Sequence, residues 1–173
     1  MSKITKATLQ DIKQLAPLAK EAFLTAHGHS ASKKDIANYV AANFSESSFV
    51  EQLSNPDNRY YIIYHQNKMA GYSKVTLNTP TANIGSKNIT YMSRLYLLKE
   101  FYGLNLGKEL FDFNLEFSKQ HQQHGIWLAV WIENKRAINF YTKRGFQIVG
   151  KHDFRISETH SNPNHILYLE YVL

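Results

Sequence analysis

The second half of the chain alternates between the patterns of a strand and a helix. Residues 89–98 are rich in β-forming side chains, residues 103–121 show a helical period, and residues 126–132 are apolar throughout. A continuous apolar run of that length is typical of a strand covered on both faces. Strand–helix–strand succession joins parallel strands through a right-handed crossover, so a sheet with helices on both faces is expected.

The rest of the chain supplies the other strands and helices. Local patterns favour strands at 4–7, 60–65, 69–77, 146–156 and 165–173, and a loop at 78–88. Thr8 with Asp11, Ser32 and Asn134 are expected to cap three helices, the last ending at Gly145. On the helix at 103–121 the inward face is predicted to hold Leu106, Leu110, Phe113 and Phe117.

These elements predict one α+β domain over residues 1–173. It would be layered α/β/α, with a mixed central β-sheet of about seven strands flanked by four helices. Residues 27–54 are polar and mixed, and are expected to be mobile or to face a substrate.

Composition narrows the classes of protein. The net charge of +6 comes from basic residues scattered along the chain, which argues against nucleic acid and fits a polyanionic small-molecule cofactor. Cysteine is absent, which removes disulfides and thiolate metal sites and suits a reducing compartment. No signal peptide and no membrane span of about 18 apolar residues is recognised. We therefore expect a soluble, cytoplasmic protein.

A turn containing Gly103 and Gly107 separates the strand at 89–98 from the following helix. The first N–H groups of a helix lack internal partners, and the helix dipole adds positive potential, so a pyrophosphate is favoured there. Lys99 and Lys108 can add charge. Alternatively, the glycines merely end the strand and start the helix.

Two segments resemble the cofactor motifs of the GNAT acetyltransferase superfamily. Residues 102–107 follow the pattern Gln/Arg-x-x-Gly-x-Gly/Ala, except that Tyr102 replaces the polar residue and Asn105 replaces the middle glycine. Asparagine tolerates a left-handed backbone, so the second change is mild. The other motif, Asn-x-x-Ala-x-x-Phe-Tyr-x-Lys-x-Gly-Phe, is matched in full by Asn134, Ala137, Phe140, Tyr141, Lys143, Gly145 and Phe146.

The resemblance implies a GNAT fold, acetyl-coenzyme A as cosubstrate and no metal. Strands 89–98 and 126–132 would splay apart, and Tyr141 would protonate the leaving sulfur. An inward aromatic that only packs the core is the alternative for Tyr141, and charge near a helix C-terminus is the alternative for Lys143 and Arg144. Cofactor contacts are expected from Leu95, Tyr96, Leu97, Tyr102, Gly103, Leu104, Asn105, Leu106, Gly107, Lys108, Asn134, Arg136, Ala137, Tyr141 and Lys143.

The acceptor is expected to be the primary amine of a small molecule. Segments 49–55, 69–75 and 126–131 resemble the PaiA-related bacterial spermidine/spermine acetyltransferases, which implies a polyamine, although the positive net charge argues mildly against a polycation. An aminoglycoside, an amino acid, a protein N-terminus, or a non-catalytic acyl-coenzyme A regulator are the alternatives. Candidate acceptor contacts are Glu21, Asp35, Glu46, Glu51, Tyr60 and Tyr61. For each of them the alternative, a solvated surface charge or a half-buried strand tyrosine, is favoured over the functional role.

Three further points concern the site and its partners. The glutamate that related enzymes often carry before the phosphate loop is missing, since that strand reads Tyr91-Met-Ser-Arg94, so a water chain or Glu133 is left as the general base. The histidine pairs 27/29 and 121/124 have no third ligand nearby in the sequence, which argues against a metal. A homodimer is compatible with the resemblance.

Overall fold

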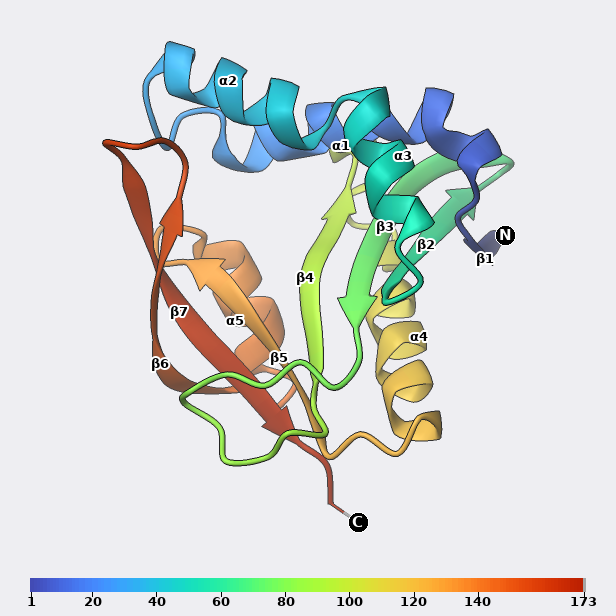
Figure 1. The fold of residues 1–173 in the computed structure, drawn as a ribbon. Helices are drawn as coiled ribbons and strands as arrows, with labels where there is room; N and C mark the ends of the chain where they lie inside the picture. Colours follow the sequence, from blue (N-terminus) through green and yellow to red (C-terminus); the bar gives the residue numbers. More distant parts are fainter. Residues whose placement is uncertain (173) are drawn as a thin grey trace. The chain divides into compact units, whose positions relative to one another are not determined.

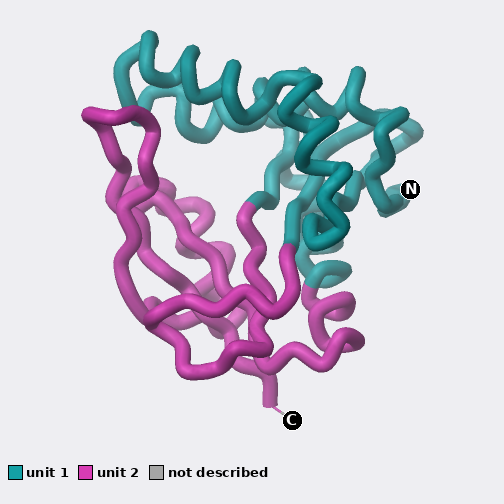
Figure 2. The backbone as a smooth tube through the Cα atoms, in the orientation of Figure 1, with its two compact units in different colours: residues 1–75, 94–114 teal, residues 76–93, 115–173 magenta. Residues whose placement is uncertain are grey.

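The computed structural model describes residues 1–172. They form two compact units (Figure 2). Unit 1 holds residues 1–75 and 94–114, and unit 2 holds residues 76–93 and the chain from residue 115 onward. The boundaries between them pass through two strands and one helix, because residues 75/76, 93/94 and 114/115 all lie inside regular elements.

The elements follow one another in the order drawn in Figure 1. The strands are β1 (Ser2–Lys6), β2 (Asn58–His65), β3 (Lys68–Thr76), β4 (Thr90–Leu97), β5 (Gly125–Trp131), β6 (Gln147–Arg155) and β7 (Ser161–Glu170). The helices are α1 (Ile12–His27), α2 (Lys33–Asn43), α3 (Glu46–Ser54), α4 (Leu106–Gln120) and α5 (Lys135–Thr142). Short 3-10 turns, Leu9–Asp11 and Lys99–Phe101, precede α1 and the loop before α4.

The strands form one seven-stranded sheet in the order β1-β2-β3-β4-β5-β7-β6. β1 pairs with β2, and β7 pairs with both β5 and β6, in antiparallel fashion, whereas β4 and β5 are parallel. The predicted mixed sheet of seven strands and its parallel crossover are therefore confirmed. The predicted last strand begins four residues earlier than expected, and its predicted end, Leu173, lies outside the described residues.

The prediction of four helices is wrong, since the described chain has five. Ser45 caps α3 by accepting a hydrogen bond from the N–H of Ser48 at 3.2 Å. Only Phe49 of this short helix is buried, and its apolar positions are too few to stand out as a helical stripe in the sequence. The region expected to be mobile or substrate-facing is thus occupied by α2 and α3.

Helices cover both faces of the sheet in unit 1. Tyr60 and Tyr61 are neighbours on β2 and point to opposite faces. Phe49 of α3 packs against the ring of Tyr60, with centroids 5.9 Å apart, and Phe113 of α4 packs against Tyr61 at 4.7 Å. Strand alternation therefore places α3 and α4 on opposite sides.

The predicted inward face of α4 is only partly right. Leu106 and Leu110 are buried, but Phe113 is 36% exposed. Asn114 takes an inward position instead, where its Nδ2 donates to Ser73 Oγ at 2.8 Å and to the Leu110 carbonyl at 2.7 Å. A polar side chain can be buried here because both of those bonds satisfy it.

In unit 2, hydroxyl groups join the second half of α4 to two other segments. Ser118 is buried, with its Oγ 2.6 Å from Thr90 Oγ1, and it accepts a hydrogen bond from Tyr171 at 2.8 Å. Ser118 is thus the second polar residue on the inward face of α4. Phe117, which the sequence analysis predicted for that face, is only half-buried.

Candidate active site

The loop between β4 and α4 turns through two left-handed residues. Gly103 has a φ of +82° and Asn105 a φ of +61°, and both are exposed. The left-handed conformation of Asn105 is the one that a glycine would adopt there, so the departure from the motif preserves the turn. The helix α4 begins directly afterwards at Leu106, with its first N–H groups lacking intrahelical acceptors.

Gly107 has no need of glycine's backbone freedom. A Cβ atom built at this position would meet only Leu97 Cδ1, at the ordinary contact distance of 3.5 Å. Alanine would therefore fit, in agreement with the Gly/Ala alternative of the motif. The contact also shows that the first turn of α4 lies against the end of β4, near the predicted backbone contacts of Leu95, Tyr96 and Leu97, which are half-buried.

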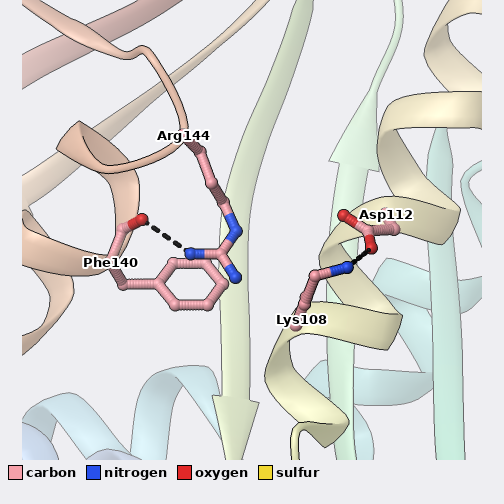
Figure 3. A network of polar contacts seen from close by, with 4 residues as sticks. All are labelled: Lys108, Asp112, Phe140 and Arg144. Carbon is pink, nitrogen blue, oxygen red and sulfur yellow. Dashed lines mark hydrogen bonds and ion pairs between the residues drawn. The ribbon is translucent and has the colours of Figure 1, made fainter.

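The lysines around the loop are exposed, and one of them is paired. Lys108 Nζ lies 2.5 Å from Asp112 Oδ2, one turn along α4 (Figure 3). With both side chains about half exposed, a pair of this kind is weak and can exchange for another anion. Lys99 also lies on the surface.

The second motif forms a helix whose two ends are both capped. The Oδ1 atom of Asn134 accepts a hydrogen bond from the N–H of Ala137 at 3.2 Å, as predicted. At the other end, Gly145 has a φ of +91°, and its N–H donates to the carbonyl of Thr142 at 3.1 Å. The N–H of Phe146 donates to the carbonyl of Tyr141 at 3.2 Å, and their rings pack 5.3 Å apart. These bonds and the apolar contact make a Schellman motif.

The Schellman motif fixes the position of Tyr141. The side chain is 7% exposed, and its ring lies edge-on to those of Phe140 and Phe146. Burial raises the pKa of its phenol above the usual value, and the charge of Arg144 lowers it by less. The hydroxyl therefore keeps its proton at neutral pH, which is the state that a proton donor requires.

Arg144 binds back onto the helix that precedes it. Its guanidinium lies 3.5 Å from the centroid of the Phe140 ring and donates to the Phe140 carbonyl at 2.9 Å (Figure 3). The alternative reading of Arg144 as a cation at a helix C-terminus is thereby confirmed. Lys143 and Arg136 lie on the exposed side of this segment.

The predicted acceptor residues come from three helices and one strand. Glu21, Glu46 and Glu51 are exposed on α1 and α3, and Asp35 is half-buried on α2. Among the described residues no three histidines, aspartates or glutamates gather as metal ligands would. None of the helices between residues 1 and 172 combines the length and hydropathy that a bilayer-spanning segment needs.

Two basic residues that the sequence analysis did not select lie beside Tyr60. Arg94 of β4 donates to the Tyr60 hydroxyl at 3.3 Å, and Lys74 of β3 lies 5.6 Å from the centroid of the Tyr60 ring. A charged residue at an inward-facing position of a strand is unusual and could have marked Arg94 as functional. The sequence Tyr91-Met-Ser-Arg94 does not reveal that Arg94 faces inward until the helices that cover the strand are known.

Comparison with known proteins decides the family. The model of the acetyltransferase (GNAT) family matches residues 16–146. The chain belongs to the GNAT acetyltransferase family. The prediction of an acyl-coenzyme A-dependent N-acetyltransferase is confirmed at this level.

Two curated relatives and one solved structure are similar to this chain. An uncharacterized N-acetyltransferase in the pepI 3′ region of Lactobacillus delbrueckii subsp. lactis is 27% identical over 156 residues, 90% of each chain. An uncharacterized N-acetyltransferase of Mycobacterium tuberculosis is 29% identical over 154 residues, 89% of this chain and 94% of the relative. The crystal structure of PaiA N-acetyltransferase from Thermoplasma acidophilum in complex with coenzyme A has a TM-score of 0.78 at 20% identity, covering 99% of both chains, which shows the predicted GNAT fold.

Proposed function

We propose that this GNAT protein transfers the acetyl group of acetyl-coenzyme A to the primary amine of a small molecule. The observation that carries the proposal is Tyr141, which is buried, protonated at neutral pH and fixed by the Schellman motif of a fully matched family motif. A regulator that only bound the cofactor would need Tyr141 for packing alone, so the hydroxyl is what distinguishes the two functions.

The residues of the β4–α4 loop fit the diphosphate of coenzyme A. The amides that follow Gly103 and Asn105 begin a helix, and the exposed Lys108 can leave Asp112 for a phosphate. The ladder between β4 and β5 joins only two residue pairs, Thr90–Ile126 and Tyr91–Trp127. By the family resemblance, the backbone of Leu95 and Leu97, which takes no part in that ladder, is left for the pantetheine arm. We propose Lys143 as a further contact to a phosphate of coenzyme A.

In the reaction, the amine nitrogen attacks the thioester carbonyl carbon. The C–N bond forms first and moves the carbonyl electron pair onto oxygen, and the nitrogen gives a proton to solvent or a base. The C–S bond breaks as the carbonyl re-forms, and the departing thiolate takes a proton from Tyr141. The phenolate then regains a proton from solvent. A backbone N–H stabilises the transient oxyanion.

The attacking amine must first be neutral. An alkylamine with a pKa near 10.4 is neutral about once in 2,500 molecules at pH 7, a cost of roughly 4.6 kcal/mol. Glu133 is exposed and remains a candidate base, together with a chain of water molecules.

Polyamine acetylation is one form of this proposal, and its support is the resemblance to the PaiA-related enzymes. An amino acid is the second form, because the side chains beside Tyr60 are cationic. Cytoplasmic location and homodimerisation stay predictions.

Two measurements test the proposal. Titration calorimetry should detect binding of acetyl-coenzyme A, and a thiol-release assay with a panel of primary amines should detect turnover. Absence of coenzyme A binding to folded protein would refute the proposal. Binding without turnover on any amine would favour the regulator.

Replacing Tyr141 tests its role separately. Tyr141→Phe should lower kcat by about a hundredfold or more, because a general acid contributes at least that much, while the Kd for acetyl-coenzyme A stays within about twofold. Tyr64→Phe, at a half-buried tyrosine on β2 outside the proposed machinery, is the control. Equal kcat values for the two variants would remove the proton-donor role.

A further inference from the structure

Arg94 lies in a largely aromatic environment within unit 1. Its guanidinium carbon is 4.7 Å from the centroid of Phe44 and 5.9 Å from that of Phe49, at the junction of α2 and α3. One of its N–H groups donates to the Tyr60 hydroxyl at 3.3 Å. The residue is half-buried rather than fully enclosed.

No acidic residue in the described part of the chain balances this charge. Among residues 1–172 no carboxylate forms an ion pair with Arg94 or with Lys74. Burial acts to lower the pKa of Arg94, and the surrounding phenols, with Tyr72 and Tyr60 foremost, raise it, so that the group remains charged.

Lys74 adds a second cation beside the first. Its Nζ donates to Gln52 Oε1 at 3.4 Å, and the hydroxyl of Tyr60 donates to the same oxygen. Burial, followed by repulsion from Arg94, lowers the pKa of Lys74 to about 8. We call Arg94, Lys74, Tyr60 and Tyr72 the arginine cluster.

Hydrogen-bond donors in the arginine cluster outnumber the acceptors. A guanidinium has five N–H donors. Arg94 donates one to the Tyr60 hydroxyl at 3.3 Å and shares a second, weaker side-chain contact with the Tyr72 hydroxyl, so donors are left over. The Tyr72 hydroxyl is fully buried and makes no hydrogen bond of normal geometry with any described residue, although Arg94 is near enough to lower its pKa against the effect of burial. An anionic oxygen beside Arg94 would satisfy both charge and donors.

Cation–π contacts offset only part of the free-energy cost of removing the guanidinium charge from water. A carboxylate would offset more of it, because a planar guanidinium can donate two parallel hydrogen bonds to the two carboxylate oxygens. We propose that Arg94 is a specificity residue that binds a carboxylate of the acceptor, which is then a small primary amine carrying a carboxylate, such as an amino acid. This inference rests on the proposed acetyl transfer. A polyamine would instead meet two cations of its own sign.

The decisive experiment compares matched acceptors in the thiol-release assay. Each pair holds an amino acid and its carboxamide, which differ in the carboxylate alone, and spermidine is included as a polycation. A charge-assisted bidentate contact should make kcat/KM about tenfold to a hundredfold higher for the amino acid than for its amide. In Arg94→Gln this ratio should fall to near one, with KM for the acceptor changed more than kcat.

Control measurements separate specificity from packing and from cofactor binding. Arg144→Gln removes a guanidinium that also stacks on a phenylalanine but lies in unit 2, and it should keep the ratio of the wild type. The Kd for acetyl-coenzyme A should be the same in Arg94→Gln as in the wild type.

Each contrary outcome has a distinct meaning. If wild-type protein accepts spermidine or the amides as well as the acids, or if Arg94→Gln keeps the ratio, the carboxylate inference is overturned and acetyl transfer stands. A loss of coenzyme A affinity in Arg94→Gln would also overturn it, because the anion would then belong to the cofactor. If no amine in the panel is acetylated, the proposed function fails and the inference fails with it.

Discussion

The helix end that holds Tyr141 offers a direct test of how the motif works. Gly145 has a φ of +91°, and a Cβ at this residue would meet only Leu169 Cδ1 at 3.5 Å. There is therefore space for a methyl group, and the cost of Gly145→Ala comes from the backbone. An alanine held in a left-handed conformation costs about 1–2 kcal/mol.

Gly107→Ala is a matched control for this substitution. It adds the same methyl group, also 3.5 Å from a leucine Cδ atom, but at a position without a positive φ. In the first turn of α4 alanine is the better helix former, by up to about 1 kcal/mol. The two variants therefore differ in backbone strain rather than in packing.

The measurement is the thermal midpoint of unfolding. In a chain of this size 1 kcal/mol corresponds to about 2–4 °C, so Gly145→Ala should lower Tm by about 2–8 °C. Gly145→Asn should lose less, because asparagine tolerates this region better, and Gly107→Ala should lose nothing. Equal Tm values for Gly145→Ala and Gly107→Ala would refute the claim that position 145 requires glycine because of its left-handed backbone conformation.

Two further predictions concern buried polar groups. Burial, then repulsion from His29, lowers the pKa of His27 to about 4. The unfolded chain therefore binds a proton at a higher pH than the folded protein, and stability should fall as the pH drops from about 6.5 to 4. His27→Phe should lose less Tm across that window, and equal losses of Tm in the variant and the wild type would contradict the lowered pKa of His27. Asn114→Ala removes the hydrogen bonds to Ser73 and to the Leu110 carbonyl and should lower the free energy of unfolding by about 1–3 kcal/mol. Chemical denaturation measures this loss, with Asn139→Ala at an exposed position of α5 as the control. Equal free energies of unfolding for the two variants would show that water replaces those bonds.

Local chemistry explains which elements the sequence could predict. The caps formed by Thr8 with Asp11, by Ser32 and by Asn134 depend on residues within three positions of one another, and all of them are present. The conformation of Asn105 follows in the same way from its own backbone preference. Such features need no knowledge of distant parts of the chain.

The misses depend on distant contacts. Helix α3 has a good cap at Ser45 but only one buried residue, so its stability comes from packing Phe49 against Tyr60 and Tyr72 on the sheet. Asn114 lies inward because Ser73, far along the chain, offers a partner. Apolar periodicity alone favoured Phe113 for that face.

Arg94 shows the same limit in the candidate site. The strand sequence marks it only as a charged residue, whereas its aromatic neighbours come from α2, α3, β2 and β3. No local pattern could place a cation among them without a carboxylate. The cofactor motifs were visible because each is contiguous in the chain.

The division of the chain inside β4 and α4 has a consequence for protein engineering. Neither compact unit is a continuous stretch of sequence, so neither can be produced by shortening the gene from one end. A fragment stopping at residue 114 would contain all of unit 1 but would also expose residues 76–93, separated from β5 and from Ser118. Such fragments should aggregate, and a split version of the enzyme would need its break in the loop between β3 and β4, where Pro80 and Gly85 already interrupt regular structure.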